Sequence, residues 1–149
     1  MIGMFWSLLG ILSGAFIAVQ APINSQLARG LGLPVAAAAF SFFSGAVVLA
    51  IATLVMTRVQ GISLDWKAPA PWLFVCGGVL GASYVTISTL LIPRIGAAAL
   101  MALIVAGQLI AGMLMDRIGF LGMAVREISL GRVAGAVLLM AGAALIRLT

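Results

Sequence analysis

Residues 95–115 read IGAAALMALIVAGQLIAGMLM, a stretch without a charged side chain in which Gln108 is the only strongly polar residue. A helix needs roughly 20 residues to cross the ~30 Å hydrocarbon core of a bilayer, and this stretch is long enough. Similar stretches recur along the chain, and no acidic residue falls inside any of them. The predicted spans are residues 2–26, 33–57, 71–92, 95–115 and 131–148. The sequence therefore predicts an all-α integral membrane protein, with residues 1–149 forming a single transmembrane domain of five helices.

Composition supports a membrane protein and argues against a nucleic-acid partner. Hydrophobic residues make up 64% of the chain, charged residues 7%, and the mean hydropathy is +1.31. A water-soluble domain of this size cannot hide so much apolar surface in one core. The net charge is +5, but the eight basic residues stand singly at segment ends instead of forming a basic face. Basic residues at helix ends anchor in the headgroup region, so the expected partner is the lipid bilayer.

Glycine- and proline-containing segments separate the predicted spans. They are residues 29–34, 61–71 and 93–96, and a longer connection, 116–131, is expected to lie partly along the interface as a short helix. An odd number of spans places the two termini on opposite sides of the membrane. Five basic residues flank the amino-terminal side (Arg58, Lys67, Arg117, Arg126 and Arg132) and three flank the other (Arg29, Arg94 and Arg147). Because this bias is weak, we expect the chain to insert in both orientations.

A five-span unit that inserts both ways can pair with itself about an axis in the membrane plane. This is the inverted-repeat architecture of many secondary transporters, and it makes the chain half of a ten-helix machine. The predicted assembly is an antiparallel homodimer, or a pair with a related five-helix chain. Small residues let helices approach closely in lipid, and Gly131, Gly135 and Gly142 in the last span are the predicted dimer contact. The competing interpretation is a parallel, non-transporting scaffold or assembly subunit.

Polar residues in the first span follow a helical stripe. Trp6, Ser13, Gln20 and Asn24 are spaced by seven, seven and four residues, which places them along one face. Pro22 lies between the two amides and lacks a backbone donor, so a kink or an unwound turn is expected there. Free backbone beside two amides suits a polar substrate. The alternative is a structural kink in which Gln20 and Asn24 bond neighbouring helices.

Further hydrogen-bonding residues occur in the other spans. Tyr84 and Ser88 are four residues apart in the third span and share a face, and Gln108 lies near the middle of the fourth. Together with the two amides of the first span, they are predicted to form a neutral pocket for a small-molecule substrate. The hydroxyls of Ser41 and Ser44 are expected to bond to their own helix.

Residues for other chemistries are missing from the sequence. There is no histidine, and Asp65, Asp116 and Glu127 fall at or outside the span boundaries. Asp116 is expected in a solvated ion pair at the end of the fourth span, next to Arg117. No metal-ligand cluster, phosphate-binding glycine loop or nucleophile with its base occurs, so we predict no enzymatic activity, no metal and no cofactor. Cys76 is interpreted as a small apolar packing residue.

Several linked motifs resemble one transporter family. They are Gln20-Ala21-Pro22-Ile23-Asn24, Ser41-Phe42 with Gly45, Gly77-Gly78 with Gly81 and Tyr84-Val85, Pro93 with Gly96-Ala97-Ala98, and Gly107-Gln108-Leu109. In this order they resemble the YdcZ-type proteins, a five-helix branch of the drug/metabolite transporter superfamily. The resemblance implies a bacterial inner-membrane protein whose larger relatives contain two five-helix halves in inverted orientation.

The chain is more distantly similar to the four-helix small multidrug resistance proteins. Those proteins carry a glutamate in the first helix, and its absence here argues against antiport of cationic drugs. Gly135 and Gly142 are similar to the heptad glycines through which those relatives dimerise. The function predicted is transport of a small polar or amphipathic metabolite by alternating access, with Gln20, Asn24 and the polar residues of the third and fourth spans replacing the hydrogen bonds that water makes to the substrate.

Overall fold

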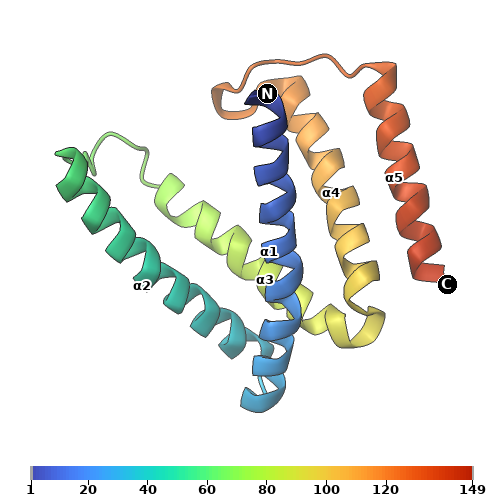
Figure 1. The fold of residues 1–149 in the computed structure, drawn as a ribbon, viewed down its shortest axis with the longest axis horizontal. Helices are drawn as coiled ribbons and strands as arrows, with labels where there is room; N and C mark the ends of the chain where they lie inside the picture. The colour runs from blue at the N-terminus through green and yellow to red at the C-terminus, as the bar shows by residue number, and fades with distance from the viewer. Residues whose placement is uncertain (1, 149) are drawn as a thin grey trace. The chain divides into compact units, whose positions relative to one another are not determined.

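The computed structural model describes residues 2–148 and is helical over nearly all of the apolar stretches. The elements are α1 (Ile2–Leu31), α2 (Pro34–Gln60), α3 (Leu73–Ile95), α4 (Ala97–Ile118), the short 3-10 helix η1 (Phe120–Gly122) and α5 (Leu130–Leu148) (Figure 1). Five helices are long and apolar enough to cross a membrane, and the described part of the chain contains no strand. The predicted all-α membrane fold with five transmembrane helices is therefore confirmed.

The connections between helices depend on glycines in the left-handed region of the backbone. Gly32 (φ 72°) and Gly61 (φ 65°) bound α2, whose first residue is Pro34, a position where the missing backbone N–H is harmless. Gly96 (φ 79°) separates α3 from α4. α3 continues through Pro93, contrary to the predicted break over residues 93–96, because a proline in the last turn disrupts little of the helix. In the 116–131 connection, helical structure between α4 and α5 is limited to η1.

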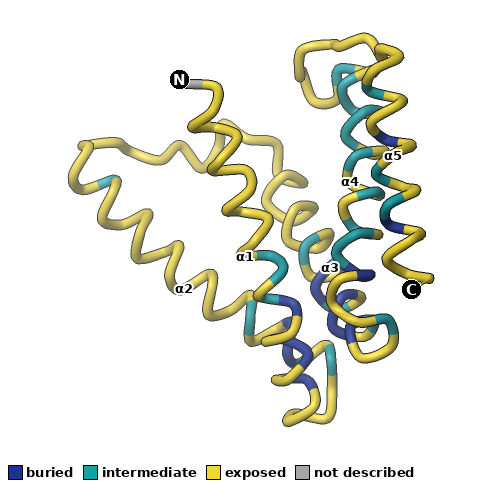
Figure 2. Tube along the Cα trace, turned by 45° about the vertical axis from the view of Figure 1, so that its right-hand side comes forward, coloured by how far each residue is buried: buried dark blue, intermediate teal, exposed yellow. Residues whose placement is uncertain are grey.

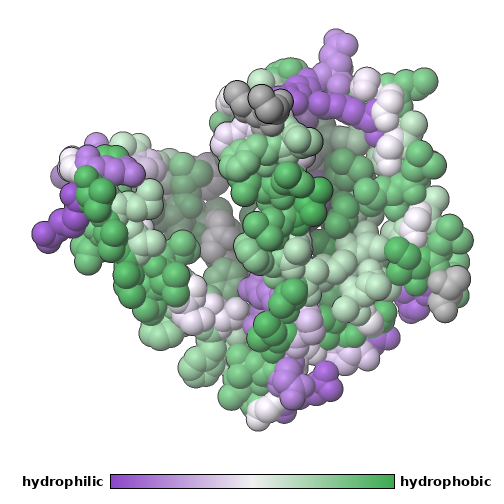
Figure 3. All heavy atoms as spheres, viewed as in Figure 1, coloured by the Kyte–Doolittle hydropathy of each residue, from purple (hydrophilic) through white to green (hydrophobic). Residues whose placement is uncertain are grey.

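Large apolar side chains are exposed along every long helix. Ile11 on α1 is 70% exposed, Leu80 on α3 71% and Leu138 on α5 73%. Figure 3 shows apolar residues over the helix bodies, with hydrophilic residues gathered near helix ends and connections. Exposing this much apolar surface to water is unfavourable, whereas lipid tails make dispersion contacts with it. These surfaces therefore require the interior of a bilayer as their solvent.

The first of two compact units runs to Pro93 and contains α1, α2 and nearly all of α3. Its buried residues lie in the carboxyl-terminal halves of α1 and α3 and at the start of α2 (Figure 2). α1 packs against α2 across the short turn. The ring of Phe42 on α2 lies over Gly81 of α3, where an added Cβ would be 2.9 Å from the Phe42 Cζ atom. Because Gly81 has no side chain, the Phe42 ring of α2 can pack directly against the backbone of α3.

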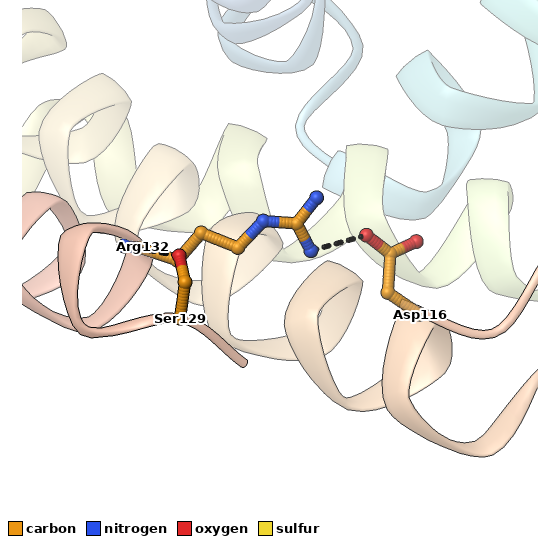
Figure 4. A network of polar contacts seen from close by, with 3 residues as sticks. All are labelled: Asp116, Ser129 and Arg132. Atoms are coloured by element: carbon orange, nitrogen blue, oxygen red, sulfur yellow. Dashed lines mark hydrogen bonds and ion pairs between the residues drawn. The ribbon is translucent and has the colours of Figure 1, made fainter. Parts of the chain in front are cut away.

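The second unit begins at Arg94 and is built on the packing of α4 against α5. Near the connection, Arg132 Nη1 donates to Asp116 Oδ2 at 3.1 Å, and Ser129 Oγ accepts the Arg132 backbone N–H at 3.4 Å (Figure 4). The backbone N–H of Arg126 donates to the Asp116 carbonyl at 2.9 Å. The ion pair expected at Asp116 is present, and its partner is Arg132, not the adjacent Arg117. Adjacent residues on a helix point about 100° apart, whereas Arg132 lies opposite, at the start of α5.

We predict that Gly81→Val lowers the thermal stability of the detergent-solubilised protein, because the added methyl groups collide with the Phe42 ring. Overpacking of this kind costs about 1–3 kcal/mol. Gly77→Val, one turn earlier on α3, is the matched control, since nothing lies within 4 Å of a Cβ placed there. Phe42→Ala combined with Gly81→Val should recover stability. Equal unfolding midpoints for the two single variants would contradict the close approach.

Candidate functional site

Buried polar residues gather on facing parts of α1 and α3. Asn24 (4% exposed) lies on α1, and Ser88 (4%) and Thr89 (3%) lie on α3. These three residues line a cavity of about 10 Å³ together with Ile17, Gln20, Ala21, Tyr84 and Val85. A volume of this size holds roughly one water molecule. The structure therefore brings together four of the predicted site residues, Gln20, Asn24, Tyr84 and Ser88.

Helical spacing explains why these residues meet. Gln20 and Asn24 are one turn apart on α1, as are Tyr84 and Ser88 on α3, so each pair presents polar groups on one side of its helix. Ala21, between the two amides, is also buried and lines the same cavity. Its small side chain leaves room for the longer polar groups beside it.

Three hydroxyl groups in this region have no hydrogen-bond partner in the described structure. The oxygens of Ser25, Tyr84 and Thr89 are buried and unpaired. The hydroxyls of Thr57 on α2 and Ser83 on α3 bond instead to a carbonyl of the preceding turn, that of Leu54 (3.0 Å) and that of Val79 (2.9 Å). Leaving a buried hydroxyl unsatisfied costs about 1–3 kcal/mol. A ligand or a water molecule that supplied the missing bonds would recover that free energy.

A larger cavity lies between α1 and α2 and shares two residues with the small one. It has a volume of about 760 Å³ and is lined by Phe16, Val19, Gln20, Ile23, Asn24, Leu27, Phe40, Ser41 and Ser44. Gln20 and Asn24 line both cavities. The two amides therefore stand where a mostly apolar groove adjoins a small polar space.

Ser41 on α2 is the hydrogen-bond partner of Gln20. Gln20 Nε2 donates to Ser41 Oγ at 3.3 Å, which links α1 to α2. Ser41 was expected to bond to its own helix, and that expectation is wrong; Ser44 does so, donating to the Ser41 carbonyl at 3.0 Å. The bond uses one N–H of Gln20 and none of the acceptor capacity of its carbonyl oxygen.

Other predicted site residues lie outside the polar cluster. Trp6 is 64% exposed and its ring stacks edge-on against Phe5 with centroids 5.4 Å apart. Ser13 is exposed, and its hydroxyl donates to the Gly10 carbonyl at 2.8 Å. The amino-terminal half of the predicted stripe thus faces outward. Gln108 belongs to the second unit, where it is exposed.

Gln108 lines a groove of about 550 Å³ between α4 and α5. Asp116, Arg132 and Gly135 line the same groove. Gly142 lines a neighbouring groove of about 410 Å³ formed by the same two helices. Two of the three glycines predicted to make the dimer contact, Gly135 and Gly142, therefore border open grooves beside α4.

Pro22 does not interrupt α1, which is helical from Ile2 to Leu31. The expected unwound turn is therefore absent from this part of the chain. The Pro22 side chain is exposed, on a different side from buried Ala21 and Asn24. Because proline has no N–H, the carbonyl four residues earlier, at Ala18, lacks its helical donor.

Sequence reasoning missed Ser25 and Thr89. Each follows a buried small or apolar residue by four positions, Ala21 and Val85 respectively, and so lies on the same helix face. That spacing was a usable signal. Ser25 and Thr89 directly follow the predicted site residues Asn24 and Ser88. A search for polar residues at spacings of four and seven along one helix face passes over such neighbours.

The cluster offers amides and hydroxyls, with no ionised group among the residues lining either cavity of the first unit. A search of the described residues finds no group of three or more His, Cys, Asp or Glu side chains placed to hold a metal ion. The chemistry available at this cluster is hydrogen bonding to a neutral group.

Comparison with known families decides what kind of protein carries this site. Residues 5–145 match the family model described as "Putative inner membrane exporter, YdcZ". The chain belongs to this family. It is a multi-pass protein of the bacterial inner membrane, and the predicted YdcZ-type resemblance is confirmed. No curated protein and no solved structure matches the chain.

We predict that Thr89→Val raises the unfolding midpoint of the ligand-free protein, because it replaces an unpaired buried hydroxyl with a methyl group of similar size. The expected gain is about 1 kcal/mol. Thr57→Val makes the same chemical change where the hydroxyl is bonded to Leu54, and should leave stability unchanged or lower. If Thr89→Val does not raise the unfolding midpoint, or lowers it, the Thr89 hydroxyl already has a hydrogen-bond partner.

Proposed function

We propose that this family member is a transporter subunit that binds a small polar or amphipathic metabolite at the polar cluster of α1 and α3. The observation that carries the proposal is the pair of buried, unpaired hydroxyls of Tyr84 and Thr89, which line one cavity together with the amides of Gln20 and Asn24. Polar groups inside membrane helices are costly and normally serve a partner, a substrate or an ion pathway. The family description, an inner membrane exporter, supports transport as the function.

Alternating access is the mechanism that we propose for this site. The cavity between α1 and α3 is nearly closed, while the adjoining groove between α1 and α2 is wide, and Gln20 and Asn24 belong to both. If the side chains of these two amides rotated from one cavity to the other, a bound substrate could move between the two cavities. The Gln20 to Ser41 hydrogen bond at 3.3 Å is long, so it breaks at little cost during such a movement.

The transporting unit that we propose is an antiparallel dimer of this chain, or a pair with a related five-helix chain. Five helices are half the number in an inverted-repeat transporter. Nothing lies within 4 Å of a Cβ placed at Gly112, Gly135 or Gly142, so the grooves of the second unit have room for a helix of a partner. Gly131 has only the Ser129 hydroxyl nearby, at 4.0 Å.

A non-transporting scaffold is the second candidate function. It is favoured by the extent of exposed apolar helix surface, since only 6% to 22% of an 18-residue apolar stretch in each span is buried within the chain. A scaffold uses such surface to bind other membrane proteins. Stabilisation by a small solute separates the two, because mass action stabilises a protein only through ligands that it binds.

We predict that Gln20→Ala and Asn24→Ala abolish efflux of a solute panel from proteoliposomes while leaving the dimer intact by cross-linking. The amides are proposed to replace water around the substrate, and their loss leaves it without hydrogen bonds. Ser83→Ala is the control, because the exposed Ser83 hydroxyl bonds to its own helix. Gln108→Ala tests whether the second unit contributes to binding. Wild-type rates in both Gln20→Ala and Asn24→Ala would refute the site.

We predict that a reporter fused after Thr149 is found on both sides of the membrane in comparable amounts. The five-to-three distribution of basic residues is too weak to fix one orientation. Adding one arginine on either side should move the population toward one orientation. A single orientation that resists these additions would exclude the antiparallel homodimer and leave an oppositely oriented partner chain or a parallel assembly.

A further inference from the structure

We infer that the polar cluster selects uncharged solutes that carry hydrogen-bond-accepting oxygens at one end and an apolar body at the other. The inference rests on the proposed function and specifies the substrate class of the same site. Three features of the first unit carry it: the neutrality of the lining, the surplus of hydroxyl donors, and the apolar groove next to the polar cavity.

The lining holds no charge that would balance an ion. The residues that surround the two cavities are amides, hydroxyls and apolar side chains. The charged residues of the first unit, Arg29, Arg58, Asp65 and Lys67, are exposed and lie at helix ends or in the connection between α2 and α3. Moving an unpaired ion into a site of low polarity is far more costly than moving a neutral amide or alcohol.

The unpaired hydroxyls require acceptors. Tyr84 and Thr89, which line the polar cavity, each have an O–H that donates to nothing in the described structure. A bound cation would engage their oxygens and leave the O–H donors unused, whereas a carbonyl or hydroxyl oxygen of a solute accepts from them. The carbonyl of Gln20 retains its acceptor capacity for a solute N–H or O–H. Amides and alcohols therefore match the site better than ammonium ions.

The adjoining groove accounts for the apolar body of the solute. Phe16, Val19, Ile23 and Phe40 line it, with Gln20 and Asn24 at its border with the polar cavity. The groove is open, with a volume of about 760 Å³, and the side chains of Phe16, Ile23 and Phe40 are each at least 60% exposed. A solute whose polar end reaches the hydroxyls can leave its apolar part in this groove.

Matched solutes that differ only in the charge of one end test the inference. Purified protein in detergent is unfolded thermally at neutral pH with benzamide, benzoate or benzylammonium, and again with hexanamide, hexanoate or hexylammonium. We expect both amides to raise the unfolding midpoint in a saturable way, with half-saturation at least about tenfold lower than for either ion. Thr89→Val should weaken the response to the amides by about tenfold, the loss of one hydrogen bond. Thr57→Val should not change it.

An equal or larger response to either ion overturns the inference, and so does a response to the amides that is unchanged in Thr89→Val. Absence of a midpoint shift with all six solutes in the wild-type protein also overturns it. These results are distinguishable from failure of the proposed function. If the protein prefers an ion and Asn24→Leu abolishes that binding, the proposed site and function hold and only the substrate class is wrong. If Gln20→Ala and Asn24→Ala retain wild-type efflux, the proposed site is wrong.

Discussion

The bilayer interior provides no water, so every polar group that enters it must find a partner within the protein or its ligand. This constraint explains most of the architecture. Each apolar stretch becomes a helix because the helix satisfies its own backbone, and chain reversals are placed at glycines such as Gly32 and Gly61 near charged residues. The same constraint makes the exceptions informative. Unpaired hydroxyls at Ser25, Tyr84 and Thr89 stand out beside those of Thr57 and Ser83, which bond to their own helix backbone.

Helix packing inside each unit depends on a few hydrogen bonds, ion pairs and closely packed small residues. Apolar surface alone does not favour contact between helices over contact with lipid. In the first unit these are the Gln20 to Ser41 hydrogen bond and the Phe42 ring over Gly81. In the second, the half-buried pair of Asp116 and Arg132 links α4 to α5. The remaining exposed surface of the helices is largely apolar, which suits both lipid contact and movement against a partner.

Much of the fold was predictable from the sequence, because apolar length and the absence of internal charge specify transmembrane helices directly. The candidate site was predictable only in part. The four-residue spacings of Gln20 with Asn24 and of Tyr84 with Ser88 identified facing stripes, and the structure places both around one cavity. Hydrogen-bond and ion-pair partners that lie on another helix could not be predicted from any local sequence pattern. Ser41 bonds Gln20, and Asp116 bonds Arg132, because of how helices lie beside each other.

A transported solute must reach the cluster of α1 and α3 from water, although the cluster is buried in the structure and lies within membrane helices. Cysteine reactivity tests this most directly. In a Cys76→Ala background, Ser88→Cys and Leu80→Cys are exposed to a membrane-impermeant methanethiosulfonate reagent, which reacts with thiolates and therefore requires water. Ser88 is 4% exposed and Leu80 71% exposed on the same helix. We predict that the buried position 88 is labelled and the lipid-facing position 80 is not. An unreactive position 88 would show a dry packing contact and contradict the access of solutes to this cluster.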